Sequence, residues 1–151
     1  MKEIIIIIFV FLVFSCNMKR PNIECFDPNN WSADTSYYVA NKLYEGFIFP
    51  ANYNPLGFKI EDERFTPSEE QIHRAELILA ESDKIFNRRY KRQYIGRINS
   101  NSDSLIWIYL LKTRFKKQEC FDRIVSFGCG SYFEKYQRSK LVNLETRKIE
   151  Y

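Results

Sequence analysis

The sequence predicts an α+β domain in which one long helix packs on an antiparallel β-meander of about four to five strands. Residues 67–87 carry apolar side chains at the 3.6-residue spacing of an amphipathic helix. Segments after residue 90 instead alternate every two residues or are apolar on both faces, as strands do. The chain also has thirteen Phe, ten Tyr and two Trp, which favour strands and bulky cores.

The first element is an export signal over residues 1–15. Ile4 to Phe14 is an unbroken run of eleven apolar residues. A membrane-spanning helix needs about 20 such residues, whereas a signal-peptide core needs roughly 7–15. We therefore expect this run to direct export rather than to span a membrane.

The run ends in Val13-Phe14-Ser15-Cys16, which resembles the lipobox of bacterial lipoproteins. This resemblance implies cleavage after Ser15, a diacylglycerol on the Cys16 thiol and an acylated new amino terminus, so that palmitate-type chains become incorporated. Two or three such chains anchor a protein stably to a membrane. The expected location is the cell envelope, on the periplasm-facing side of the outer membrane.

Residues 16–31 are polar, contain Pro21 and Pro28 and predict a lipidated tether. Residues 32–151 then suit one domain. The stretch from Ser32 to Gly46 is ambiguous, and one interpretation is a short helix capped by Ser32 and ended by Gly46. Residues 47–55 read as extended or looped, and residues 57–65 as a possible edge strand.

The helix over 67–87 has the clearest start signal. In Thr66-Pro67-Ser68-Glu69, Thr66 predicts the N-cap, Pro67 the first helical position and Glu69 the partner of a capping box. Its apolar stripe consists of Ile72, Ala75, Ile78, Leu79, Ile85 and Phe86.

Strands are expected to follow the helix. The pattern predicts a strand over 90–98, a turn over 99–103 and a central strand over 105–111. It then predicts strands over 123–128 and 131–137 around a turn at Gly128-Cys129-Gly130, and short strands over 141–144 and 147–151.

In outline this arrangement is similar to cystatin-like or NTF2-like domains, a likeness of fold that carries no function. The segments Arg64-Phe65-Thr66-Pro67 and Tyr90-Lys91-Arg92-Gln93-Tyr94-Ile95-Gly96 also resemble small lipoproteins of unknown function from Bacteroidetes-type bacteria. That resemblance covers roughly residues 45–151 and implies no catalytic residues.

Charge is distributed unevenly along the chain. Residues 24–83 contain twelve acidic and four basic residues, and residues 84–151 contain six acidic and sixteen basic ones. The two halves can compensate each other when they pack. Alternatively, the basic run forms a face that binds an anionic ligand, with Arg88, Arg89, Lys91, Arg92 and Arg97 as candidates. On a strand, Arg92 would share a face with Tyr90 and Tyr94, whereas Arg89, Lys91 and Arg97 would point the other way.

The sequence contains no recognisable catalytic constellation. His73 is the only histidine, and it lies nearly opposite the apolar stripe, so we expect it to face solvent. Glu70 and His73 have the spacing of a di-iron pair, but such sites need two pairs on facing helices. A Ser or Cys nucleophile usually needs a histidine base nearby. We therefore expect no enzyme, no cofactor and no metal.

Three cysteines other than Cys16 remain: Cys25, Cys120 and Cys129. An oxidising compartment permits a disulfide. If residues 123–128 were extended, Cys120 and Cys129 would lie too far apart to be bridged. Cys25 is then the expected partner in any bridge.

Two function classes remain open. One is a non-catalytic envelope module that binds a protein partner, for example as an inhibitor or immunity factor. The other binds an anionic ligand such as lipopolysaccharide, a phospholipid headgroup or nucleic acid through the basic run, with nucleic acid the least expected of these.

Overall fold

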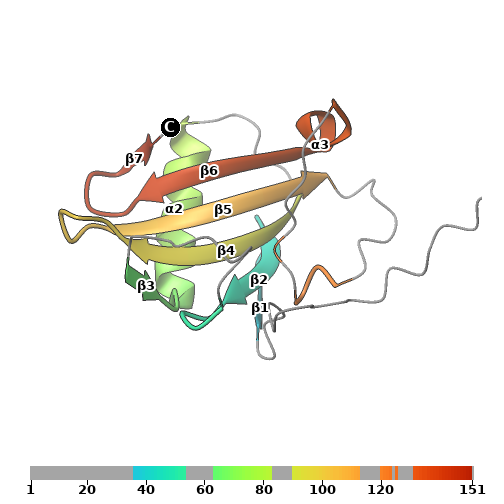
Figure 1. Cartoon of the computed structure of the whole chain (residues 1–151). Coiled ribbons are helices and arrows are strands. Elements are labelled where there is room, and N and C mark those ends of the chain that lie inside the picture. Colours follow the sequence, from blue (N-terminus) through green and yellow to red (C-terminus); the bar gives the residue numbers. More distant parts are fainter. Residues whose placement is uncertain are drawn as a thin grey trace, which may run out of the picture.

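A computed structural model describes residues 36–53, 63–82, 90–112, 120–123, 125 and 131–150. Within these ranges seven strands form one sheet, and helix α2 (Glu69–Ser82) lies across one face of it (Figure 1). The α+β class predicted from sequence is therefore correct. The sheet nevertheless has more strands than the predicted four to five, and it is mixed rather than antiparallel.

The sheet order is β1-β2-β4-β5-β6-β7, and β3 pairs with β4. The strands are β1 (Tyr37–Ala40), β2 (Glu45–Phe49), β3 (Glu63–Phe65), β4 (Tyr90–Ile98), β5 (Ser104–Lys112), β6 (Gln137–Asn143) and β7 (Lys148–Glu150). The mixed character arises at one edge of β4. Residues 92–95 pair there with β2 in parallel, and residues 96–98 pair with β3 in antiparallel fashion.

The short helix predicted between Ser32 and Gly46 is wrong over the described residues. β1 and β2 form a hairpin there, and the Asn41 side chain closes its turn by accepting the N–H groups of Leu43 and Tyr44 at 2.7 and 3.1 Å. Asn side chains commonly stabilise turns in this way. The turn thus separates two strands. Their apolar residues happen to have helical spacing, which is why the sequence pattern indicated a helix.

Helix α2 begins at Glu69, two residues later than the predicted start at Pro67. The Ser68 hydroxyl accepts the N–H of Gln71 at 3.2 Å, and the Gln71 side-chain oxygen accepts the N–H of Ser68 at 2.9 Å. This reciprocal pair is a capping box with Ser68 as the N-cap. The predicted N-cap, Thr66, instead accepts the N–H of Ala51 at 2.9 Å, so it ties the helix entry to the end of β2.

The predicted apolar stripe of the helix is confirmed where it is described. Ile72, Ala75, Ile78 and Leu79 are all buried, whereas Ile85 and Phe86 lie outside the described residues. The predicted strands over 90–98 and 105–111 are also confirmed, and β5 lies in the middle of the sheet as its two apolar faces predict.

Apolar side chains cover both faces of the sheet. On the helix face, α2 packs against residues such as Tyr94, Ile106 and Val142. On the opposite face, here called the outer face, Phe49 and Ile95 pack with further residues that include Tyr53, Tyr109 and Val125. Two layers of apolar packing explain why most of β5 is buried.

The segment before β6 differs from its prediction. Residues 131–136 form the short helix α3 (Ser131–Tyr136) rather than a strand. Residues 120–123 form a turn in which Arg123 donates its N–H to the carbonyl of Cys120 at 2.9 Å, so the predicted strand over 123–128 is wrong at its start. Helical and strand periods are hard to distinguish over segments this short.

Cys120 is disulfide-bonded. It is the one cysteine within the described residues, so its partner is Cys16, Cys25 or Cys129. The turn at 120–123 removes the extended strand on which the argument against Cys129 depended. Pairing with Cys25 therefore stays a prediction.

Candidate functional site

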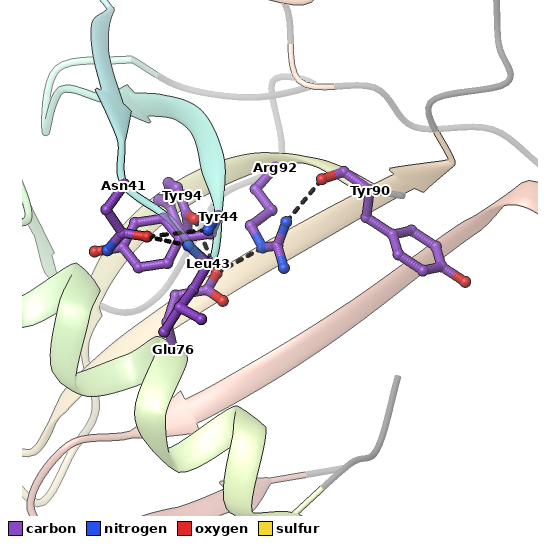
Figure 2. Close-up of polar contacts among 7 residues, drawn as sticks. All are labelled: Asn41, Leu43, Tyr44, Glu76, Tyr90, Arg92 and Tyr94. Atoms are coloured by element: carbon purple, nitrogen blue, oxygen red, sulfur yellow. Dashed lines mark hydrogen bonds and ion pairs between the residues drawn. The ribbon is translucent and has the colours of Figure 1, made fainter. Parts of the chain in front are cut away.

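A buried ionic network joins α2 to the helix face of β4. Glu76 and Arg92 are 2% and 1% exposed, and 2.9 Å separates Arg92 Nε from Glu76 Oε1. Arg92 Nη1 also donates to the carbonyl of Tyr90 at 2.7 Å. Figure 2 shows Glu76 projecting from the helix toward the Arg92 guanidinium, beneath the β1–β2 turn.

Two tyrosines complete this network. Tyr94 donates its hydroxyl to Glu76 Oε1 at 2.8 Å, and the Tyr44 ring stands edge-on to the Tyr94 ring with centroids 6.3 Å apart. β2 comes close enough because residue 46 is glycine: a Cβ there would lie 2.8 Å from the Tyr94 ring. The hairpin thereby closes over the ion pair.

Burial dominates the electrostatics of the network. It raises the pKa of Glu76, although the Arg92 charge and the Tyr94 hydrogen bond act in the opposite direction. Burial likewise raises the pKa of Tyr94, and the negative charge of Glu76 adds to that shift. The second carboxylate oxygen of Glu76 is buried without a hydrogen-bond partner in the described part of the chain, which is costly for a charged group.

These groups do not form an accessible reaction centre. A perturbed carboxylate can indicate an active site when it lies in a cleft, but Glu76 is only 2% exposed and is covered by the protein's own side chains. Its geometry suits a structural role, in which it holds the helix to the sheet and neutralises Arg92. The sequence contains a weak signal for this buried carboxylate, because Glu76 lies at the edge of the apolar stripe, one helical turn after Ile72.

His73 is exposed, as predicted from the helical pattern. Its ring lies 6.4 Å from the Tyr44 ring at a tilted angle. Over the described ranges, no group of three or more His, Cys, Asp or Glu side chains is placed to hold a metal ion.

The candidate basic residues do not share one exposed face. Arg92 is buried on the helix face, so its assignment to a ligand-binding surface is corrected: its guanidinium pairs with Glu76. Lys91 is exposed, and Arg97 is half-buried with its guanidinium 5.3 Å from the Trp107 ring centre. Strand alternation places these last two on the outer face. Arg88 and Arg89 lie outside the described residues, as do Ser15 and Cys16.

The outer face contains a second arginine that the sequence pattern did not indicate. Arg64 of β3 stands directly opposite Arg97 in the strand register. Arg64 donates to the carbonyls of Gly96 and Tyr53 at 2.8 and 3.2 Å. Burial and the neighbouring Arg97 charge lower its pKa to about 10. Only the pairing of β3 with β4 brings the two guanidinium groups to the same place.

No helix in the described part of the chain is long and apolar enough to span a membrane. Comparison with known proteins finds no match among protein-family models, curated proteins or solved structures.

Proposed function

We propose that this chain is an envelope lipoprotein, anchored to a bacterial membrane through lipid on Cys16, whose single domain is a non-catalytic binding module for a protein partner. The observation that carries the proposal is Val13-Phe14-Ser15-Cys16 at the end of eleven apolar residues. Lipid chains contribute about 0.8 kcal/mol per buried CH₂, so two or three chains hold a domain at the membrane surface.

Two structural features support this proposal. The disulfide at Cys120 suits an oxidising compartment such as the periplasm. The perturbed carboxylate of Glu76 is enclosed within packing, which favours binding over catalysis as the role of the domain.

The order β3, α2, then the meander β4 to β7 also supports the analogy with cystatin-like folds, namely a strand, a long helix and an antiparallel meander. The analogy concerns architecture alone. We propose that the domain itself acts as such a binding protein, for example as an inhibitor or an immunity protein that binds its target.

Cys16→Ser tests the anchor. In cells fed labelled palmitate, the variant should incorporate no label and should keep its signal uncleaved at Ser15. Asn17→Ser is the matched control, because it changes the residue next to Cys16, keeps Val13-Phe14-Ser15-Cys16 and should leave labelling intact. A Cys16→Ser chain that is still labelled, or still cleaved at Ser15, would show that the lipobox assignment is wrong.

A second candidate function is the binding of an anionic ligand at the outer face. The observation that favours it is the position of Arg64 opposite Arg97, which brings two arginines together on the outer face, where one phosphate or carboxylate group would accept hydrogen bonds from both. The Arg97 variant described in the Discussion tests it.

A further inference from the structure

The two outer edges of the sheet are built differently. At one edge, β7 is three residues long and consists of Lys148, Ile149 and Glu150. Short edge strands with charged residues discourage pairing with other chains. At the other edge, β1 has the sequence Tyr-Tyr-Val-Ala, with no charge and no proline. The β1 edge therefore lacks the charged residues and the proline that commonly protect an edge strand.

The hydrogen-bonding direction of β1 follows from its pairing with β2. Asn41 donates its N–H to the carbonyl of Tyr44 at 2.9 Å, so Asn41 faces the partner strand. In the register of this hairpin, Tyr37 and Val39 face the same way. The N–H and C=O groups of Tyr38 and Ala40 consequently point away from β2. Within the described residues no strand lies on that side of β1.

Large side chains flank this edge. Tyr37, Tyr38 and Leu43 are 56%, 59% and 52% exposed, which is high for residues of this size. The Tyr38 ring is held in place, with its centroid 5.4 Å from that of Phe47 and its hydroxyl 3.4 Å from Glu45. A second chain lying along β1 would thus find both backbone partners and preplaced aromatic surfaces.

A second copy of this chain is a poor occupant. Its own β1 turns back at Asn41 after four residues, about 13 Å of strand. If the contact between two β1 strands were about 13 Å long and about 10 Å wide, the two copies together would bury on the order of 300 Å². This area is well below the roughly 1,000 Å² that a stable interface needs. A segment of another protein can continue past β1 and cover Leu43 as well.

We propose that β1 is a docking strand, to which an extended segment of a partner protein adds as a further strand, with apolar residues on both of its faces to cover Tyr37 on one side of the sheet and Tyr38 on the other. This inference rests on the proposed partner-binding function and identifies its surface. Main-chain hydrogen bonds to Tyr38 and Ala40 would supply affinity, and the flanking tyrosines would supply specificity.

The test places the photo-cross-linker p-benzoylphenylalanine at Tyr38 of the full-length chain in cells of the natural host. The expected result is a discrete adduct with a heterologous protein. Ala40→Pro should then reduce the adduct about tenfold or more, because proline removes one outward N–H and its ring occupies the edge. Ala40→Thr, which keeps the N–H, should retain the adduct.

Proline is tolerated where an edge N–H faces solvent, and equal melting temperatures of the two Ala40 variants verify that the hairpin survives. If Ala40→Pro melts lower, Tyr38→Lys replaces it, with the cross-linker moved to Tyr37. An adduct that persists at full strength with the edge variant would overturn strand addition. A cross-link within the chain, or an adduct of twice its mass, would also overturn the proposal, because the chain itself would then occupy the edge.

A control cross-linker at Glu70, an exposed residue in the first turn of α2, separates this inference from the proposed function. An adduct from Glu70 but not from Tyr38 would overturn docking at β1 and leave partner binding intact. The absence of an adduct from either position would count against both.

Discussion

Two arginines of β4, five residues apart and on opposite faces of the sheet, have opposite electrostatic environments. Arg92 is 1% exposed and faces the carboxylate of Glu76. Arg97 is half-buried and faces the guanidinium of Arg64. A fully buried charge needs a specific partner because it has lost its water. A half-buried charge keeps part of its hydration, so it tolerates a like-charged neighbour.

The comparison also assigns different roles to the two faces. On the helix face, the ion pair links α2 to the sheet, so its loss should be measured as lost stability. On the outer face, we expect Arg97 to contribute little to stability, so its loss should be measured mainly as lost binding. Four predictions test this division, and those with the greatest expected change in stability come first.

Glu76→Ala should lower the free energy of unfolding by about 3–5 kcal/mol, because it leaves the buried Arg92 guanidinium and the Tyr94 hydroxyl without the oxygen that they contact. Urea denaturation of the soluble domain measures this. Glu81→Ala is the matched control in the same helix: Glu81 is 67% exposed, its ion pair with Arg147 spans 3.6 Å, and such exposed pairs contribute about 0–1 kcal/mol.

The double variant Glu76→Leu, Arg92→Met distinguishes a loss of packing from the cost of an unpaired buried charge. Replacing a buried ion pair by apolar side chains of similar size is often neutral or stabilising. The double variant should therefore recover most of the stability that Glu76→Ala loses. If it is as unstable as Glu76→Ala, the loss would come from packing rather than from an unpaired charge.

The second prediction concerns pH. Burial raises the pKa of Glu76 above its ordinary value of 4.5, so the folded state binds this proton more tightly than the unfolded state does. Its contribution to stability is then fully present below pH 4.5 and is lost as pH rises through the raised pKa. The slope is at most about 1.4 kcal/mol per pH unit for one proton.

Glu76→Gln cannot titrate and should lack this component. Subtracting its unfolding free energy from that of the wild type at each pH, with other carboxylates unchanged, isolates the contribution of Glu76. A difference that grows in favour of the wild type as pH rises above 4.5 would mean that Arg92 outweighs burial.

Ser68→Ala should destabilise the domain by about 1 kcal/mol, because it removes the N-cap acceptor of the helix that carries Glu76. Amide exchange of Gln71 should become faster, since the Ser68 hydroxyl accepts that N–H. Thr66→Ala removes a different bond, to Ala51, and should leave Gln71 exchange unchanged. Equal acceleration in both variants would argue against Ser68 as the cap.

The smallest stability effect is expected at Arg97. Arg97→Gln should change the unfolding free energy by no more than about 0.5 kcal/mol, because surface substitutions seldom do more and relief of repulsion from Arg64 offsets the lost contact with Trp107. Binding of the soluble domain to anionic vesicles at low salt should weaken instead. Binding that resists both this substitution and added salt would argue against an anionic ligand at this face.

Helix α2 and strands β4 and β5 were predictable because their patterns are long. Over 14 and 9 residues, the helical and strand periods separate clearly. The β1–β2 hairpin and α3 were not predictable, because each of these segments spans only a few residues and fits the helical period as well as the strand period. The parallel pairing of β2 with β4 joins residues 46 positions apart, and no local pattern encodes such a contact.

The candidate sites divide in the same way. The alternation of Tyr90, Arg92 and Tyr94 against Lys91 was readable from sequence, and the strand places them as expected. The burial of Arg92 was not readable, because it depends on Glu76 arriving from a separate helix. Arg64 was missed for the same reason, since only strand pairing sets it opposite Arg97.

The α+β class, the amphipathic helix, the central strands and the lipobox-like motif from which the membrane anchor is proposed were all predictable, because each of these is encoded by neighbouring residues. Tertiary contacts set which charges are paired, which face each arginine occupies and which strand lies at each edge of the sheet within the described residues. Those properties depend on contacts between residues far apart in the chain, where burial removes water and makes the identity of the neighbour decisive.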